Sequence, residues 1–215
     1  MKLKPFAKPL DQSKRDEILD AALSVFAEVG FKEATVRQIC KKAKANVCLV
    51  SYYFEGKEAL YKSVFERVYN DRISQFQDLL QNANEIQTAE EFRMRLRVHI
   101  EQLHLRMTEN FSFFKVMQRE IMEGLPRLEK MVTEFISLSQ VHLSSYISVG
   151  QKKKFIKKDL NPQLVTSALM LMLAGFLQHQ ALERPELFFL GLTDKEIPES
   201  INKIVTTIFF DGVLQ

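Results

Sequence analysis

Four residues between positions 37 and 57 carry side chains suited to binding another molecule: Arg37, Asn46, Ser51 and Lys57. An arginine guanidinium matches the O6 and N7 acceptors of guanine, and a lysine ammonium pairs with phosphate as a point charge. On an ordinary protein surface, such residues are simply solvated. Their chemistry therefore depends on the elements that position them.

Positive charge is concentrated in the same part of the chain. Residues 1–57 hold 11 Lys and Arg against 7 Asp and Glu, which gives a net charge of +4. Residues 58–215 hold 19 against 20, which gives −1. This asymmetry favours a polyanionic partner for the N-terminal part of the chain.

Sequence motifs typical of catalysis are absent. The chain has no G-x-S-x-G, H-E-x-x-H, G-x-x-x-x-G-K or G-x-G-x-x-G pattern, and its four histidines have neither zinc nor triad spacing. Cys40 and Cys48 lack metal-ligand spacing. We expect no catalytic residue, no metal and no cofactor. Cys40 is predicted to be packed and Cys48 exposed, so oxidation of the Cys48 thiol is an alternative regulatory input.

No segment of the sequence resembles a membrane span or a signal peptide. The longest apolar run, Ala168–Leu177, has ten residues, whereas a spanning helix needs about 20. No apolar segment follows the N-terminal lysines. We expect a soluble, cytoplasmic protein without a membrane partner.

The elements that position the candidate residues are predicted to be helices. Seven glycines and six prolines leave little room for a turn-rich β architecture, so the fold class is all-α. One apolar face runs over Ser13–Val29, and Gly30 offers the left-handed conformation that ends a helix.

Two short helices are predicted next, each with a capping residue in front of it. Thr35 and Gln38 form a capping box for a helix over 36–43. Asn46 is an N-cap for a helix over 47–53. Two short helices joined by a tight turn and braced by a longer one form a helix-turn-helix.

The rest of the chain is also predicted to be helical, giving nine or ten helices in all. The expected segments are 57–82, 89–107 after a capping box at Thr88, 111–122, 125–149, 162–182 and a last helix from about 198.

Three blocks of the N-terminal part resemble a known family. ILDAALSVFAEVGF at 18–31, TVRQICKKA at 35–43 and YYFEGKEAL at 52–60 are similar to the DNA-binding domain of TetR/AcrR family transcriptional regulators. The resemblance implies a three-helix DNA-binding domain over 11–71, with the helix-turn-helix at about 35–54. It also implies a ligand-binding and dimerisation domain over 72–215. By this resemblance, the protein would be a homodimeric repressor that a small-molecule effector releases from a palindromic double-stranded DNA operator.

The resemblance also implies which residues meet DNA. Arg37 would reach a base edge, the backbone at Val36 and Lys57 would meet phosphates, and Tyr53 would contact the DNA backbone. The predicted reading surface of the second short helix comprises Asn46, Val47, Cys48, Leu49, Ser51 and Tyr52. The turn Ala43–Asn46 lacks the glycine usual in the family, so either a non-glycine residue adopts the left-handed conformation, at about 1 kcal/mol, or the turn has another shape.

A ligand pocket and a dimer interface are expected in the larger domain. The pocket prediction rests on histidines and large apolar side chains of the middle helices, which suit an apolar or aromatic effector: His99, Leu103, Phe113, Phe114, Met117, Met131, Phe135 and His142. The interface prediction rests on the apolar faces of the last two long helices: Ala168, Met172, Gly175, Phe176, Ile201, Val205 and Ile208.

Two other functions fit the same residues. A helical ligand-binding or interaction protein need not recognise a specific operator, and a transcriptional activator would have the same DNA-binding residues as a repressor.

Overall fold

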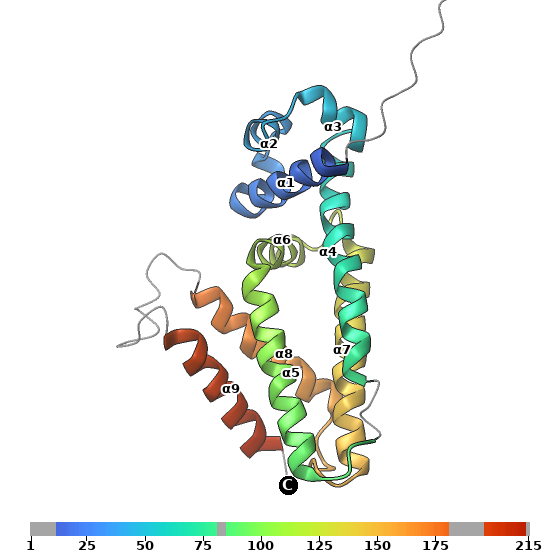
Figure 1. Cartoon of the computed structure of the whole chain (residues 1–215), viewed down its shortest axis with the longest axis vertical. Coiled ribbons are helices and arrows are strands. Elements are labelled where there is room, and N and C mark those ends of the chain that lie inside the picture. Colours follow the sequence, from blue (N-terminus) through green and yellow to red (C-terminus); the bar gives the residue numbers. More distant parts are fainter. Residues whose placement is uncertain (1–11, 81–84, 181–195, 214–215) are drawn as a thin grey trace, which may run out of the picture. The chain divides into compact units, whose positions relative to one another are not determined.

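The computed structural model describes residues 12–80, 85–180 and 196–213, and these ranges contain nine α-helices and no β-strand (Figure 1). This confirms the all-α prediction. The helices are α1 (Gln12–Glu33), α2 (Val36–Lys42), α3 (Val47–Phe54), α4 (Lys57–Leu80), α5 (Ala89–Glu109), α6 (Phe111–Met122), α7 (Glu129–Lys152), α8 (Pro162–Gln180) and α9 (Glu196–Val213).

Most helix ends lie within a few residues of the predicted ones, and the largest differences are at the end of α1, which was predicted at Val29, and at the start of α7. We predicted a helix from 125, but α7 begins at Glu129. Leu125 instead has a φ of 60°, and its N–H donates to the Glu120 carbonyl at 2.7 Å. Residues 124–128 therefore form a turn that ends α6, and they do not begin the next helix.

The chain divides into two compact units. The first contains the described residues up to Asp71 together with Phe111–Val132, and the second contains Arg72–Asn110 with the described residues from Thr133 onward. We expected a domain boundary near residue 71, but we did not expect α6 in the first unit. Helix α4 is continuous and contributes residues to both units.

The first unit is built on α1, which contacts both α2 and α6. Its buried side carries Ile18, Leu19 and Phe26. The helical path breaks at Gly30, where φ is 79° and ψ is 172°, a conformation essentially restricted to glycine. A helix break at Gly30 was predicted, although the backbone lies outside the left-handed helical region.

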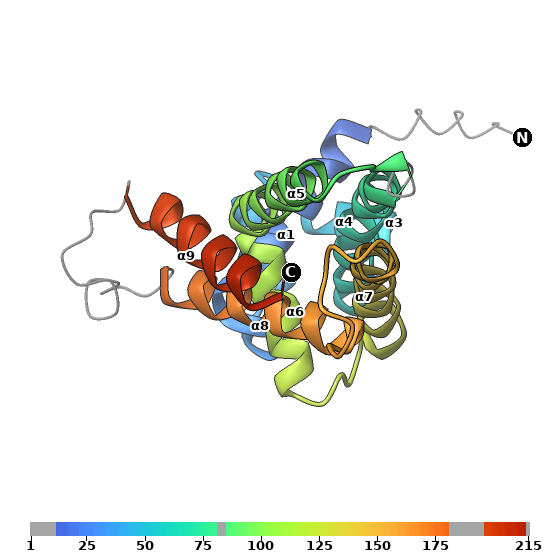
Figure 2. The same ribbon diagram turned by 90° about the horizontal axis from the view of Figure 1, so that it is seen from below.

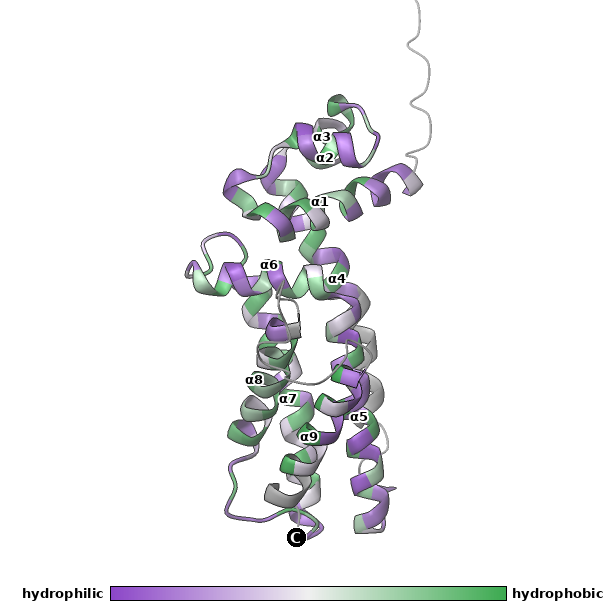
Figure 3. Ribbon diagram, turned by 90° about the vertical axis from the view of Figure 1, so that its left-hand side faces the viewer, coloured by the Kyte–Doolittle hydropathy of each residue, from purple (hydrophilic) through white to green (hydrophobic). Residues whose placement is uncertain are grey.

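The second unit is built around one apolar cluster of α5, α7, α8 and α9. Phe92 of α5 stacks on Tyr146 of α7 with ring centroids 4.7 Å apart, and Leu169 and Leu173 of α8 are fully buried. Helices α8 and α9 lie side by side in Figures 1 and 2, and both also contact α5. Much of α8 is coloured as hydrophobic in Figure 3, whereas α5 carries hydrophilic colour along much of its length.

Candidate nucleic-acid interface

The start of α2 is fixed by a complete capping box. The Thr35 hydroxyl accepts from the Gln38 backbone N–H at 3.2 Å, and the Thr35 N–H donates to Gln38 Oε1 at 2.7 Å. Two backbone donors that the helix leaves unpaired are thereby satisfied. The predicted capping box is confirmed, and it fixes the position of α2's first turn, which carries Val36 and Arg37.

The turn after α2 is a Schellman motif with a lysine in the position that glycine usually occupies. Lys44 has a φ of 47°, its N–H donates to the Lys41 carbonyl at 3.3 Å, and the Ala45 N–H donates to the Cys40 carbonyl at 2.9 Å. These are the two hydrogen bonds that define the motif. Of the two alternatives raised by the missing glycine, the first holds: the turn keeps its shape and Lys44 adopts the left-handed conformation.

Helix α3 begins at a second confirmed cap. Asn46 Oδ1 accepts from the Cys48 N–H at 2.9 Å. The helix ends where Glu55 takes a left-handed conformation and donates its N–H to the Ser51 carbonyl at 3.2 Å. With both ends fixed, the eight residues of α3 present a constant face to the solvent.

Burial separates the two faces of α3. Val50 and Phe54 are buried against the unit, and Leu49 and Tyr53 are half-buried. The remaining predicted contact residues are exposed: Asn46, Val47, Cys48, Ser51 and Tyr52. Helices α2 and α3 thus bring the predicted DNA-contact residues onto neighbouring parts of one unit (Figure 1).

Arg37 is exposed on the first turn of α2, and Val36 beside it is half-buried. Within the described part of the chain, the Arg37 guanidinium makes no hydrogen bond or ion pair. Lys41 and Lys44 are also exposed. The Lys42 ammonium, by contrast, donates to the Ser24 hydroxyl at 2.5 Å. The surface beside α3 is therefore positively charged.

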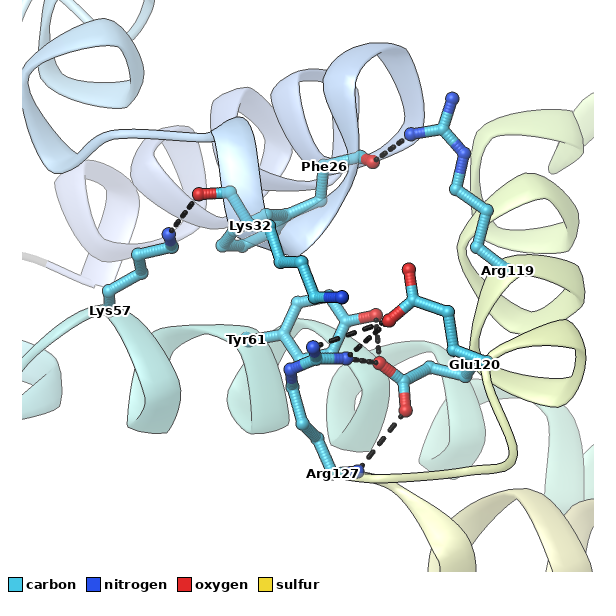
Figure 4. Close-up of polar contacts among 8 residues, drawn as sticks. Phe26, Lys32, Lys57, Tyr61, Arg119, Glu120 and Arg127 are labelled. Carbon is cyan, nitrogen blue, oxygen red and sulfur yellow. Dashed lines mark hydrogen bonds and ion pairs between the residues drawn. The ribbon is translucent and has the colours of Figure 1, made fainter.

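Lys57 has an internal role that the sequence did not reveal. Its ammonium donates to the Lys32 carbonyl at 3.2 Å (Figure 4). It also lies 4.5 Å from the centroid of the Phe31 ring. An ammonium has three donors, so a phosphate contact remains compatible with this hydrogen bond. The predicted phosphate contact of Lys57 stays a prediction.

A buried ionic network ties α6 to α4 within the first unit. Glu120 is 1% exposed, and its carboxylate accepts from the Tyr61 hydroxyl at 2.9 Å and from the Arg127 guanidinium at 2.7 Å (Figure 4). Burial, together with the neighbouring Glu120 charge, raises the pKa of Tyr61 above its ordinary value, so this phenol stays a hydrogen-bond donor. Arg127 also pairs with Glu123 and lies 4.4 Å from the centroid of the Phe31 ring.

Arg119 links α6 to the end of α1. Its guanidinium donates to the carbonyls of Phe26 at 3.5 Å and Glu28 at 3.0 Å. Carbonyls near the end of a helix lack intrahelical donors and carry partial negative charge. Sequence reasoning missed Arg119, Glu120 and Arg127. Arg119 meets its partners across 93 and 91 residues and Glu120 meets Tyr61 across 59, whereas Arg127 bonds to Glu120 only seven residues away.

The predicted pocket residues fall in both units. Phe113, Phe114, Met117 and Met131 belong to the first, where Phe113 packs on Phe65 with centroids 4.7 Å apart. His99, Leu103, Phe135 and His142 belong to the second. Leu103 is part of the apolar core, and the other three are half-buried.

Among the predicted pocket residues, His99 has a strongly lowered pKa. Burial, and to a smaller extent the positive charge of Arg106, lowers the pKa of His99 to about 4. The imidazole is therefore neutral at neutral pH and able both to donate and to accept a hydrogen bond. A second histidine of α5, His104, is buried with its Nδ1 2.6 Å from Asn202 Oδ1, a contact that the sequence did not predict.

The structure changes the register of the predicted dimer face on α9. Ile201 and Val205 are 1% and 0% exposed because they pack into the core of the second unit, so they offer no surface to a partner. Ile204 and Ile208 are instead 46% and 55% exposed. The sequence pattern placed these four residues on one apolar face of α9, and it could not show which of them pack into the core.

On α8 the predicted face is partly exposed. Ala168 is exposed and Gly175 half-buried, whereas Met172 and Phe176 pack partly against the core of the second unit. Leu164 and Leu171, which we did not predict, are 69% and 72% exposed.

Two other classes of site are absent from the described ranges. None of the described helices combines the length and apolar character needed to cross a membrane. The same residues contain no group of three or more His, Cys, Asp or Glu placed to hold a metal ion.

Comparison with known proteins identifies the N-terminal segment. The profile of the family described as "Bacterial regulatory proteins, tetR family" matches residues 18–64, which span most of α1 through the start of α4. The helix-turn-helix segment of this chain is therefore similar to that of TetR-family regulators.

Two curated relatives agree with this assignment. The chain is 25% identical to the HTH-type transcriptional regulator YttP of Bacillus subtilis over 174 residues, which cover 78% of this chain and 79% of that protein. It is 46% identical to the HTH-type transcriptional repressor NicS of Pseudomonas putida over 55 residues, which are 26% of each chain. The second likeness spans about a quarter of its relative's length. The relatives are regulators and not enzymes.

Solved structures share the fold over nearly the whole chain. The fatty acid degradation regulator FadR of Bacillus halodurans matches with a TM-score of 0.69 and 19% identity, covering 97% of this chain and 98% of that one. The ketosteroid transcriptional regulator KstR2 of Mycobacterium tuberculosis matches with a TM-score of 0.71 and 18% identity, covering 94% and 95%.

Proposed function

We propose that this protein is a TetR-family regulator, a homodimeric repressor that binds a palindromic DNA operator and is released by a small molecule with an apolar body. The observation that carries the proposal is the exposed face of α2 and α3. Both helices are fixed by caps, the face is flanked by Arg37, Lys41 and Lys44, and Arg37 has no internal partner among the described residues. Such a face suits insertion of a recognition helix into the major groove.

The dimer is proposed to form through the exposed apolar rows of α8 and α9. Leu164, Ala168 and Leu171 lie on α8 at spacings of four and three residues, which places them on one face. On α9, Ile204 and Ile208 border a shallow groove with Ser200, Lys203 and Thr207. Large apolar side chains exposed in a contiguous row mark an interaction surface. The same rows on a second copy would make a two-fold interface.

Gly175 supports the same face. Apart from the glycine's own stretch of α8, no atom of the described residues lies within 4 Å of a Cβ added at this position, so a partner helix would find the α8 backbone uncovered by them. A partner helix can approach a glycine more closely than any other residue.

The effector is proposed to bind in the second unit. His99 is kept neutral by burial, and Leu103, Phe135 and His142 are the other predicted pocket residues of that unit. A neutral histidine among apolar side chains suits a ligand with an apolar body and one polar group. Among proteins of the same fold, FadR of Bacillus subtilis was solved in complex with stearoyl-CoA. We infer an effector of comparable apolar character.

Helix α4 offers a route for regulation, because it contributes residues to both units. A ligand that favours one arrangement of a shared helix must weaken the binding of any partner that favours another, by linkage. Coupling of roughly 1–3 kcal/mol is typical, which is a 5–150-fold loss of affinity for the operator.

In-vitro selection of bound DNA from a random library tests the operator. We expect an enriched palindrome whose half-sites are about one helical turn apart. A library without enrichment would favour the alternative of a ligand-binding protein that has no specific operator. Expression of a reporter placed behind the selected sequence would separate repressor from activator.

Light scattering tests the dimer. The wild-type chain should have about twice its mass of 25.0 kDa, and Leu171→Lys should give a monomer. Leu171 suits this test better than Met172, which packs partly against the core of its own unit. Exposed Val98 of α5 provides the matched control, because Val98→Lys adds the same charge away from the proposed interface. A monomeric wild type at micromolar concentration would contradict the dimer.

A thermal-shift screen tests the effector. Compounds that raise the melting temperature should lower operator affinity, and His99→Phe should reduce their binding. If every such compound leaves operator affinity unchanged, regulation by a ligand is wrong for this protein, and oxidation of Cys48 becomes the input to examine.

A further inference from the structure

Helix α3, the proposed recognition helix, has an unusual set of side chains. The sequence of α3 is VCLVSYYF, which contains no Arg, Lys, His, Asn, Gln, Asp or Glu. Hydrogen-bonded recognition of bases relies mainly on those residue types. Within α3, only Ser51, the tyrosine hydroxyls and the weakly polar Cys48 thiol can take part in such bonds.

Asn46, the carboxamide residue directly before α3, already makes a hydrogen bond within the protein. Its Oδ1 accepts from the Cys48 N–H at 2.9 Å as the N-cap of α3. A bidentate bond to adenine requires both the oxygen and the amide nitrogen of the same side chain. Asn46 cannot make that contact without giving up the stabilising cap of α3.

The exposed face of α3 is correspondingly apolar. Val47 is 44% and Tyr52 58% exposed, and Cys48 is exposed between them along the chain. Cys48 and Tyr52 are four residues apart and therefore lie on the same side of the helix. The Tyr52 ring meets the Tyr53 ring edge-on at 5.2 Å between centroids, which supports its orientation.

Charge identifies the occupant of this face. An apolar protein partner would not require basic neighbours, but Arg37, Lys41 and Lys44 all lie exposed on α2 and the turn beside it. The major groove of DNA combines flanking phosphates with one kind of apolar group, the C5 methyl of thymine. Apolar side chains framed by positive charge match that combination.

We propose that α3 reads the operator chiefly through thymine methyl groups, with Val47 and Tyr52 as the specificity-determining residues. This inference rests on the proposed operator binding and specifies its chemistry. Arg37 on α2 supplies the hydrogen-bonded contact, to guanine, at a different position of each half-site.

Deoxyuridine provides the direct test, because uracil keeps the base-pairing groups of thymine and lacks only the methyl. The selected operator is synthesised with deoxyuridine in place of each symmetric pair of thymines in turn, and Kd is measured for the full-length protein. Burying one methyl group corresponds to about a fourfold change in Kd. Replacing a contacted pair of thymines, one in each half-site, should therefore weaken binding about 16-fold.

Variants assign the contact to its residues. Val47→Ala should weaken binding to the thymine operator. Replacing the thymine pair that Val47 contacts by deoxyuridine should then change the Kd of this variant less than twofold. The same should hold for Tyr52→Ala and the thymine pair that Tyr52 contacts. Val98→Ala, the same truncation at an exposed site of α5, should respond like wild type. Circular dichroism confirms that each variant keeps its helices.

Three results would overturn the inference. An operator with every thymine replaced that keeps its Kd within twofold would show that methyl groups are not read. A deoxyuridine effect of equal size in wild type, Val47→Ala and Tyr52→Ala would remove these residues from the role. Selection without an enriched sequence would refute operator binding itself, which distinguishes failure of the proposed function from failure of this inference.

Discussion

Different kinds of contact stabilise the interior of each of the two compact units. In the first, the buried Glu120 carboxylate joins Tyr61 and Arg127, and Arg119 reaches carbonyls of α1 just before its break at Gly30. In the second, the cluster around Phe92 is almost wholly apolar. Ionic hydrogen bonds have fixed distances and angles, whereas apolar contacts are not directional. The first unit, which carries α2 and α3, therefore adds directional contacts to its own apolar core.

The difference also concerns the surfaces that each unit leaves exposed. The first unit exposes a small face whose backbone is fixed by caps at Thr35 and Asn46. The second exposes long apolar rows on α8 and α9, including Leu171 and Ile208. A surface that discriminates bases needs a fixed geometry, and a surface that associates with a second copy needs apolar area.

Removing the central carboxylate of the first unit should have the largest effect on stability. Glu120→Ala leaves the buried Tyr61 hydroxyl and the Arg127 guanidinium without their shared acceptor, which should cost about 3–5 kcal/mol in the free energy of unfolding. Glu123→Ala is the control, because it removes only the half-exposed partner of Arg127 and should cost less than about 1 kcal/mol. Urea denaturation followed by circular dichroism measures both. Equal losses would show that the network does not brace the first unit.

Acid should affect the second unit through His99. Because burial lowers the pKa of His99 from 6.5 to about 4, protons bind the unfolded chain first as the pH falls. The stability contributed by neutral His99 is complete above pH 6.5 and is lost as the pH falls from 6.5 through 4, reaching on the order of 3 kcal/mol. His99→Gln should lack this part of the acid loss. The measurement is the urea midpoint between pH 7.5 and 4, and identical pH profiles for wild type and variant would exclude His99 as the cause.

Two glycines distinguish a strained position from an open one. Gly30→Ala places a Cβ 2.9 Å from Arg119 Nη1 on a backbone with φ of 79°, and should destabilise the chain by about 1–3 kcal/mol. In the isolated subunit, Gly175→Ala meets open space on a helix and should stabilise it by about 0.5–1 kcal/mol. The Leu171→Lys background, expected to be monomeric, allows both to be compared by urea denaturation. A stabilising Gly30→Ala would contradict the assigned backbone.

The turn between α2 and α3 should respond least. Lys44 pays about 1 kcal/mol for its left-handed conformation, so Lys44→Gly should recover part of this cost and raise the free energy of unfolding by less than about 1 kcal/mol. Lys41→Gly, inside α2, should instead destabilise by about 1 kcal/mol. A loss of stability in Lys44→Gly would mean that the lysine side chain itself holds the turn.

The features predicted correctly from the sequence were those encoded over a few residues. The caps at Thr35 and Asn46 and the helix break at Gly30 depend on residues no more than three positions apart, so the local sequence predicts them. Even the missing glycine was noticed, although the sequence did not decide between a strained Lys44 and another turn.

The features that were missed depend on distant parts of the chain. Glu120 meets Tyr61 across 59 residues, and nothing in either local sequence distinguishes this carboxylate from a solvated one. On α9, rows 201/205 and 204/208 are equally apolar, and only the packing of α5 and α8 buries the first of them. The apolar periodicity therefore predicted helix α9 correctly, but it did not predict which of its apolar residues are exposed.

Operator binding by Arg37→Ala tests the central claim, that the α2–α3 face reads DNA, most directly. The variant should bind the selected palindrome about 5–150-fold more weakly and lose its preference at one base pair of each half-site. Arg93→Ala, which removes the same charge from an exposed site of α5, should bind like wild type. Fluorescence anisotropy at fixed salt, with every substitution at each half-site position, measures both affinity and preference. If Arg37→Ala keeps the affinity and the base preferences of the wild-type protein, Arg37 does not read the operator and the proposed orientation of α2 and α3 on DNA is wrong.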